Sequence, residues 1–419
     1  MGTRRPGPCL GFRAYSRLCQ GEEQIVAYGT RSKPCAILHP INKSNLAYAM
    51  LFMHCFGVIE GMEHIRACVV GATGFAGVEV CRIVLGHPAL ELTMATDRKA
   101  AGTRLADVYP AFEGACDLVL SLPEPEAIAQ NADVAFLAVP HTASLAITPQ
   151  LLSLGVTVID LSADYRLHDA AVYEQWYGTP HTSPELLGQT VYGLPELNRS
   201  GLLALEKRHE EGEAVLVAVP GCYPTATALA AIPALEAGLS TGDLVISDAI
   251  SGVSGAGRTP NARTHFCHAN ESVEAYGVAH HRHTPEIEQT LTQVAGHDMN
   301  VVFTPHLAPL TRGLLATVYM TAADGVTAND VQDAYERRYA NEALVSTLPA
   351  GHMPQTSSVA ATARAQVGVA LDDRRRRVII ASCAIDNLGK GAAAQAMQCA
   401  NLLLGLPETQ GIGATAPLI

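Results

Sequence analysis

The chain has 419 residues, of which 48% are hydrophobic, 16% charged and 5% aromatic. This length and composition predict two or three globular domains of ordinary size with ample core. The net charge of −12 disfavours nucleic acid or an anionic membrane as a partner. Eleven cysteines, an odd number without framework-like spacing, indicate reduced thiols in a cytoplasmic protein.

Residues 1–61 differ from the rest of the chain. They carry a charge of +4, which leaves −16 for the remainder. Their apolar stretch, residues 46–59, is interrupted by His54 and is shorter than the roughly 20 residues that span a bilayer. A basic, acid-poor beginning is compatible with an organellar transit peptide. We instead expect Met62 to be the functional start, and on either view residues 1–61 are an extension outside the folded domains.

A glycine turn follows the first good strand pattern. Residues 65–70 have strand composition, residues 71–77 read Gly-Ala-Thr-Gly-Phe-Ala-Gly, and residues 78–85 have helix composition. This order is typical of a dinucleotide site, in which glycines let the backbone approach a pyrophosphate at the helix N-terminus. The Gly-x-x-Gly-x-x-Gly spacing is not the commoner one, so a structural turn is the alternative. The context favours nucleotide binding.

The end of the next strand bears on the choice of nucleotide. Residues 91–96 predict a strand that ends at Asp97, Arg98 and Lys99. An acidic residue there usually holds the ribose hydroxyl of NAD, whereas an Arg accommodates the 2′-phosphate of NADP. Both are present, so these residues leave the choice open, and a charged turn in solvent also fits.

Two further buried strands predict the architecture. Residues 134–139 lead to Pro140 and His141, and residues 156–161 lead to a polar run that ends at Arg166. Buried strands that alternate with helical stretches predict an α/β fold with a doubly wound parallel sheet. Ligands bind at the carboxyl ends of such strands, where these polar residues lie.

The run Val-Pro-Gly-Cys-Tyr-Pro-Thr at residues 219–225 places Cys222 near the start of a helix. Residues 215–219 predict a buried strand, and residues 226–232 predict a helix with Pro224 in its first turn. Free backbone N–H groups and the helix dipole then favour the thiolate, which is the nucleophilic form. A buried packing cysteine is the alternative.

A second glycine-rich run follows the strand predicted at residues 244–250. Residues 251–258 read Ser-Gly-Val-Ser-Gly-Ala-Gly-Arg. Exposed N–H groups of such a loop bind anions, and Arg258 adds a fixed positive charge. A flexible crossing loop is an equally good interpretation.

Three histidines lie in residues 276–287, just before a helix that Thr284 can cap. A histidine there is a candidate proton donor, because its reference pKa lies near neutral pH. A solvated loop and a metal site are the alternatives. The spacing matches no standard zinc pattern, so we expect no metal.

Near the end of the chain, a strand at residues 378–385 precedes Asp-Asn-Leu-Gly-Lys-Gly at residues 386–391 and a helix at residues 392–404. Asn387 and Lys390, at this strand-to-helix turn, are candidate cofactor contacts. The alternative is a terminal helix that docks for stability alone.

From about Met62 to the C-terminus, the chain resembles the N-acetyl-γ-glutamyl-phosphate reductase family of arginine biosynthesis. The resemblance is carried, in chain order, by residues 71–77, 219–225, 251–258, 281–287 and 386–391. The resemblance implies a semialdehyde dehydrogenase-like fold. Its parts are a Rossmann-type NADP-binding domain at residues 62–221, an α+β catalytic domain with a mixed sheet at residues 222–386, and a C-terminal helix at residues 387–419 that returns to the first domain. Family members usually form homo-oligomers, commonly tetramers, through the second domain's sheet.

The resemblance also implies a reaction, the NADPH-dependent reduction of the small molecule N-acetyl-L-glutamyl 5-phosphate to N-acetyl-L-glutamate 5-semialdehyde and phosphate. Cys222 forms a thioester with the acyl group, hydride reduces it, and His281 is the acid/base, with His283 as the fallback. A related reductase that acts on an aminoadipyl or aspartyl phosphate is the alternative, since one methylene gives little discrimination.

The same resemblance assigns binding residues. Cofactor contacts are expected at Gly71, Thr73, Gly74, Phe75, Ala76, Gly77, Arg98, Pro140, Asn387 and Lys390. Substrate contacts are expected at Arg166, Tyr192, Ser251, Gly252, Arg258 and Tyr276. Asp97 departs from the Ser or Thr that the family often has before this Arg, and an acid there would repel a 2′-phosphate.

Overall fold

The computed structural model describes residues 12–19, 22–29, 34–37 and 64–416. The first three ranges are strands β1 (Phe12–Cys19), β2 (Glu22–Gly29) and β3 (Pro34–Ile37), which form a small antiparallel sheet. The sequence patterns predicted none of these strands. The expected start at Met62 and the apolar stretch 46–59 lie outside the described residues. The chain from His64 onward forms a separate compact unit.

The first half of this unit contains a parallel sheet, as the sequence predicted. Its strands are β4 (Ile65–Val70), β5 (Leu90–Thr96), β6 (Val134–Leu137), β7 (Thr157–Asp160), β8 (Val191–Tyr192) and β9 (Leu216–Ala218). They pair in the order β5-β4-β6-β7-β9-β8, and every neighbouring pair is parallel. The carboxyl ends of these strands therefore meet at one edge of the sheet.

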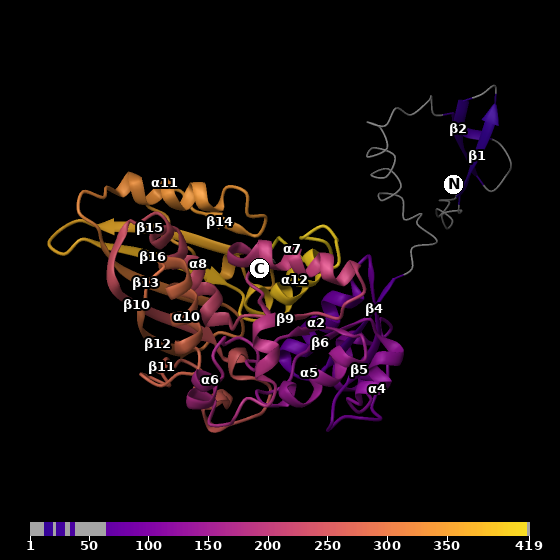
Figure 1. The fold of residues 1–419 in the computed structure, drawn as a ribbon, viewed down its shortest axis with the longest axis horizontal. Coiled ribbons are helices and arrows are strands. Elements are labelled where there is room, and N and C mark those ends of the chain that lie inside the picture. Colours follow the sequence, from indigo (N-terminus) through magenta and orange to yellow (C-terminus); the bar gives the residue numbers. More distant parts are fainter. Residues whose placement is uncertain (1–11, 20–21, 30–33, 38–63, 417–419) are drawn as a thin grey trace, which may run out of the picture. The chain divides into compact units, whose positions relative to one another are not determined.

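Helices cover both faces of this sheet (Figure 1). One core contains α2 (Phe75–Leu85), α7 (Pro195–Glu210) and α12 (Ala394–Leu403), and the other contains α4 (Pro125–Asn131), α5 (Ala143–Ser153) and α6 (Ala170–Tyr177). Successive strand residues point to opposite faces, so Phe136 packs in the first core and Ala135 in the second. No helix in the described part of the chain is long and apolar enough to cross a membrane.

The second half contains a mixed sheet, also as predicted. Its strands are β10 (Ser240–Gly252), β11 (Glu274–Ala275), β12 (Asn300–Ala308), β13 (Leu314–Ala322), β14 (Val345–Thr347), β15 (Ala365–Asp372) and β16 (Val378–Ile385), in the order β11-β12-β10-β13-β16-β15-β14. The β10–β12 and β14–β15 pairs are parallel and the others antiparallel. Helices α8 (Cys222–Glu236), α10 (Thr284–Ala295) and α11 (Ala328–Tyr339) pack on one face.

The opposite face of the mixed sheet exposes apolar side chains. Leu244, Ile246 and Ile250 of β10 are 47%, 37% and 38% exposed, and Val302 of β12 is 51% exposed. Ile246 lies opposite Val302 on one side and Tyr319 on the other. These four side chains are the exposed apolar residues of a surface that we call the β10–β12 face, on which the exposed Asp248 lies between Ile246 and Ile250.

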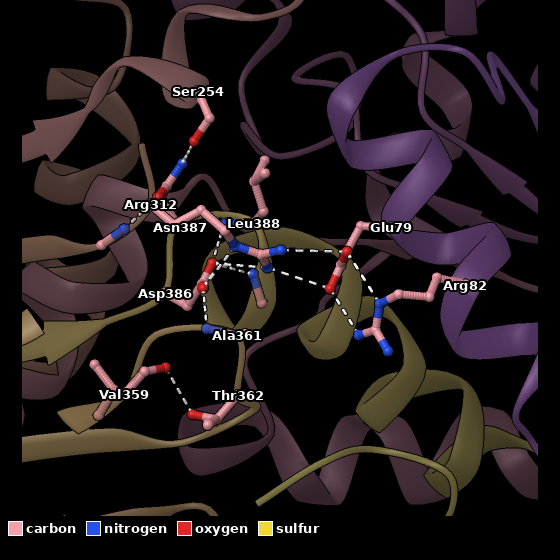
Figure 2. A network of polar contacts seen from close by, with 12 residues as sticks. Glu79, Arg82, Ser254, Arg312, Val359, Ala361, Thr362, Asp386, Asn387 and Leu388 are labelled. Atoms are coloured by element: carbon pink, nitrogen blue, oxygen red, sulfur yellow. Dashed lines mark hydrogen bonds and ion pairs between the residues drawn. The ribbon is translucent and has the colours of Figure 1, made fainter. Parts of the chain in front are cut away.

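An ion-pair cluster joins the two halves. Arg312, in the β12–β13 turn, donates to both carboxylate oxygens of Asp386 at 2.8 and 3.1 Å and to both of Glu79 at 3.2 and 3.3 Å (Figure 2). Glu79 belongs to α2 of the parallel-sheet half, whereas Asp386 follows β16. Burial alone would raise the pKa of Glu79, but hydrogen bonds from Arg82 and Arg312 hold it below its usual value. One guanidinium therefore bridges two carboxylates from different halves, and Arg82 supplies a second positive charge to Glu79.

We predict that Arg312→Met destabilises the protein by about 2 to 4 kcal/mol, because it leaves the buried Asp386 carboxylate without its cation. Urea unfolding followed by circular dichroism measures the change. Arg374→Met is the matched control, since Arg374 pairs with Asp372 on the surface, with 84% of its side chain exposed, and such pairs contribute little. Equal effects of the two substitutions would contradict the assignment.

Candidate active site

Cys222 lies at the carboxyl edge of the parallel sheet. β9 ends at Ala218, and α8 begins at Cys222 itself, with Gly221 as its N-cap and no side-chain cap. Sequence analysis predicted the helix slightly later. Cys222 is half-buried and lines a cleft of about 550 Å³. A Cβ at Gly391 would lie 2.7 Å from the Cys222 Cβ, so only glycine fits behind the cysteine there.

The cleft brings together residues from both halves of the unit. Besides Cys222, the predicted residues that line it are Arg166, Ser251, Tyr276, His281 and His283. The lining also contains seven polar residues that were absent from the predicted site: His141, Ser162, Tyr177, Tyr223, Asn261, Arg263 and Arg282. The position of Arg282 between two predicted histidines was a usable signal. Tyr177 and Asn261 carry no local signal.

The most extensively bonded group behind the cleft is Glu286, which sequence analysis treated only as a helix-start residue. Its Oε1 accepts hydrogen bonds from the Gly221 N–H and the Tyr192 hydroxyl, both at 2.9 Å, and its Oε2 lies 3.2 Å from Arg166 Nη1. The Glu286 side chain is 1% exposed. This carboxylate therefore links α10 to the residue before Cys222.

Both predicted histidines reach the cleft from the chain just before α10. The N-cap of α10 is His283, and Thr284 lies inside the helix. The expectation that Thr284 caps this helix is therefore wrong. His281 Nδ1 accepts the N–H of His283 at 3.1 Å. A Cβ at Gly221 would lie 2.5 Å from His283 Nε2, so this ring rests on the turn before Cys222. Nδ1 of His283 is buried without a hydrogen-bond partner among the described residues.

The imidazoles are held neutral. Burial, with a smaller contribution from the Arg282 charge, lowers the pKa of His281 to about 4. Burial, together with His281 and nearby arginines, also lowers the pKa of His283 well below its usual value. A neutral imidazole can accept a proton, which is what a neighbouring thiol requires of it.

The thiol itself differs from the sequence expectation. Burial raises the pKa of Cys222 to about 11, because it outweighs the stabilisation of the thiolate by the Tyr223 N–H and Arg166, and Glu286 adds to the increase. The expected thiolate is therefore wrong for the unliganded protein. The helix start is present, but desolvation is the stronger effect.

Two predicted substrate contacts lie behind the cleft. The Tyr192 hydroxyl is buried and bonded to Glu286. Gly252 packs against backbone, since a Cβ there would lie 2.8 Å from Leu310 O. Neither lines the cleft. Tyr276 does line it, and its hydroxyl donates to that of Tyr223 at 3.2 Å. Tyr192 thus holds Glu286 and does not face the cleft.

Arg258 also differs from its predicted role. Its Nη1 donates to Thr73 O at 3.1 Å, and its guanidinium lies 5.0 Å from the Tyr109 ring centroid. Gly257, at φ +82°, turns the chain just before Arg258. The structure therefore places this charge at the glycine turn, away from the residues that line the cleft.

The glycine turn fits a dinucleotide. Gly71 has φ +84°, a Cβ on it would collide with Ala138 O, and a Cβ on Gly77 would collide with Gly71 O. α2 begins at Phe75 after Gly74, and no side chain caps it. The first N–H groups of the helix therefore remain available to an anion. Ala76, in the same first turn, is half-buried.

Asp97 is fully engaged by its own turn. The Thr73 hydroxyl and the N–H groups of Lys99 and Ala100 donate to its carboxylate. Burial opposes ionisation, but these hydrogen bonds hold the pKa of Asp97 below its usual value. Arg98 is exposed, and within residues 64–416 no hydrogen bond or ion pair engages its side chain. Asp97 thus shapes the turn, and Arg98 is free to meet a phosphate.

The remaining predicted cofactor contacts separate into two groups. Pro140 is exposed at the carboxyl end of β6, and Asn387 Nδ2 donates to Ser254 Oγ at 2.9 Å beside the loop that lines the cleft. Lys390 is fully buried, and its Nζ lies 2.6 Å from both Glu196 Oε1 and Gln398 Oε1. The π-helix Gly389–Ala393 turns this side chain inward. Lys390 therefore stabilises the packing of the C-terminal helix and does not reach the cleft.

Comparison with known proteins agrees with this geometry. Residues 66–204 match the family model of the semialdehyde dehydrogenase NAD binding domain, and residues 222–387 match that of the semialdehyde dehydrogenase dimerisation domain. The chain is 45% identical over 349 residues to N-acetyl-gamma-glutamyl-phosphate reductase of Geobacter sp. (strain M21), covering 83% of this chain and 98% of the relative. The protein of the same name from Symbiobacterium thermophilum is 47% identical over 355 residues, covering 84% and 99%.

Solved structures share the fold at low identity. Aspartate semialdehyde dehydrogenase II from Vibrio cholerae aligns with a TM-score of 0.61 at 17% identity, over 82% of this chain and 99% of the other. Aspartate semialdehyde dehydrogenase with NADP from Candida albicans aligns with a TM-score of 0.58 at 14% identity, over 81% and 100%. These likenesses concern the fold.

We predict that iodoacetamide alkylates Cys222 slowly at pH 7, and that the rate keeps rising through pH 10 because the pKa is about 11. Peptide mass spectrometry over a time course from pH 6 to pH 10 measures it. The exposed Cys267 is an internal reference for reagent access. A rate that already levels off below pH 8 would show that the resting group is a thiolate.

Proposed function

This chain belongs to the N-acetyl-γ-glutamyl-phosphate reductase family of semialdehyde dehydrogenases, and on that premise we propose that it reduces N-acetyl-L-glutamyl 5-phosphate to N-acetyl-L-glutamate 5-semialdehyde and phosphate with NADPH, a step of L-arginine biosynthesis. The observation that carries the proposal is that Cys222, His281 and His283 line one cleft. Val139, which lies against Gly71 of the glycine turn, lines the same cleft.

The glycine turn and Arg98 would hold the cofactor. The N–H groups at the start of α2 suit the pyrophosphate, and Arg98 suits a 2′-phosphate because its side chain is exposed and unpaired among the described residues. NADPH, when bound, supplies hydride. The free Arg98 supports NADP over NAD.

The chain's own residues account for the covalent steps. Cys222 Sγ attacks the γ-carbonyl carbon, the bond to the phosphate oxygen breaks, and phosphate leaves with the electron pair. Because Cys222 is a thiol, a neutral imidazole takes its proton as the sulfur attacks. When the reduced intermediate collapses to the aldehyde, the C–S bond breaks with its electron pair on sulfur, and the same imidazole returns the proton to the sulfur. His281 remains our choice for this role, with His283 as the fallback. Tyr276 and Ser251 line the cleft beside them.

We predict that the purified protein reduces NADP in the presence of phosphate and N-acetylglutamate semialdehyde, and that Cys222→Ser abolishes this activity because no thioester forms. His281→Asn should lower kcat by about 10²- to 10⁴-fold, the usual contribution of a general acid/base. Absorbance at 340 nm measures the rate. Cys267→Ser, which alters an exposed thiol outside the cleft, should retain full activity.

The other outcomes are informative in different ways. Turnover that survives Cys222→Ser unchanged would defeat the mechanism. Loss with His283→Asn but not with His281→Asn would reverse the choice of acid/base. Preference for aspartate semialdehyde or an aminoadipate semialdehyde would assign the alternative acyl phosphate as substrate.

We also infer that the protein acts as a cytoplasmic homo-oligomer. Cysteines 68, 81, 116, 222, 267, 383 and 399 are all free, which supports a reducing compartment. The β10–β12 face exposes four large apolar side chains on the domain whose family model is described as a dimerisation domain. A second copy of this chain on that face would bury Ile246 and Val302.

We predict that Ile246→Asp shifts the protein toward a smaller oligomer, because a carboxylate in an apolar interface loses its hydration. Sedimentation velocity measures the mass. Leu203→Asp is the matched control, since Leu203 is 40% exposed on α7, outside that face. An unchanged mass for Ile246→Asp would refute this interface.

A further inference from the structure

The cleft carries positive charge without a counter-charge in its wall. Its lining contains three arginines, Arg166, Arg263 and Arg282, and three histidines, His141, His281 and His283. None of the described residues that line it is an aspartate or a glutamate. An electrostatic environment of this kind favours an anionic ligand.

Two of the three arginines are already paired with carboxylates outside the lining. Arg166 Nη1 lies 3.2 Å from Glu286 Oε2, and its other nitrogens donate to the Val219 and Leu161 carbonyls. Arg263 Nε lies 3.1 Å from Glu274 Oε2. Arg282 forms no ion pair with any carboxylate in residues 64–416. It is therefore the unpaired cation of the cleft.

The contacts of Arg282 are with neutral aromatic groups. Its Nη1 lies 2.8 and 3.0 Å from the two ring nitrogens of His141, and its guanidinium lies 5.7 Å from the Tyr177 ring centroid. Burial and then the Arg282 charge lower the pKa of His141, so this imidazole can accept a hydrogen bond but does not balance the charge. His141 and Tyr177 orient the guanidinium and leave its charge for a ligand.

Arg282 contacts a different set of groups from the two histidines that flank it in sequence. The rings of His281 and His283 lie 5.9 and 6.0 Å from the ring of Tyr223, the residue after Cys222. Arg282, between them in sequence, instead contacts His141 and Tyr177 of the parallel-sheet half. An anion bound to Arg282 would therefore lie beside His141 and Tyr177.

We propose that Arg282 binds the α-carboxylate of the substrate and is a specificity-determining residue of this cleft, with His141 and Tyr177 as its positioning residues. This inference rests on the proposed function. The proposed substrate carries one anion at its reacting end, the acyl phosphate, and one at the other end, the α-carboxylate. The phosphate is bonded to the carbonyl that Cys222 attacks, which leaves the α-carboxylate for the guanidinium beside His141 and Tyr177. A guanidinium suits it because its planar N–H groups match a carboxylate.

The test compares two aldehydes that differ only at this group. N-Acetylglutamate semialdehyde and its α-carboxamide analogue are each assayed in the phosphate-dependent reduction of NADP. The wild-type protein should prefer the carboxylate about 10- to 100-fold in kcat/KM, the range of one charge-assisted hydrogen-bonded pair. Arg282→Gln should remove this preference, and Arg282→Lys should retain part of it.

The preference is the ratio of the two kcat/KM values measured on one preparation of each variant. A partly unfolded fraction lowers both values equally and leaves the ratio unchanged. Arg263→Gln is the matched control, because it alters another arginine of the lining whose charge is already paired, and it should keep the wild-type preference. The KM values for phosphate and NADP should be unchanged in Arg282→Gln.

The outcomes separate this inference from the proposed function. If the wild-type protein oxidises neither aldehyde, the proposed function fails and the inference fails with it. If the wild type oxidises N-acetylglutamate semialdehyde and Arg282→Gln keeps the preference, only the inference is overturned. The inference is also overturned if Arg282→Gln raises only the KM for phosphate or only the KM for NADP. That result would show that the guanidinium binds phosphate or the dinucleotide instead of the α-carboxylate.

Discussion

The arrangement of the cleft depends on one buried carboxylate. Glu286 is withdrawn from water, and an ion so placed is tolerated only when donors surround it. Its donors are a guanidinium after β7, a hydroxyl at the end of β8 and the N–H of Gly221 before α8. Because Glu286 itself belongs to α10, these hydrogen bonds hold the chain that carries the two histidines against the turn that carries Cys222.

The same region shows how desolvation sets the chemistry of the site. Burial keeps the thiol protonated and both imidazoles uncharged. Neutral groups cost less to bury than charged ones, so the packed site favours the uncharged forms of the thiol and of both imidazoles. The wall keeps its permanent positive charge on arginines, where an anionic substrate can use it.

Ionic contacts behind the cleft join the two halves of the unit and so maintain the shape of the cleft. Arg312 bridges Glu79 of α2 and Asp386 after β16, and the π-helix that follows brings Gly391 against the Cys222 Cβ. The buried Lys390–Glu196 pair holds the same π-helix to α7. Such ion pairs fix the relative positions of the elements more closely than apolar packing does, although the ions lose their hydration when they are buried.

By itself, the sequence determined the local features. It placed the glycine turn after β4, Cys222 at a helix start, the histidines before α10 and the parallel sheet, because strand composition, helix composition and glycine spacing act over a few residues. The mixed sheet was expected only from the resemblance to a known family. Tertiary structure decided which charge meets which. Glu286 bonds Gly221 across 65 residues and Arg258 bonds Thr73 across 185, and the inward Lys390 meets Glu196 across 194. No short-range pattern encodes such partners, and the protonation of Cys222 depends on a burial that exists only after the two halves have packed together.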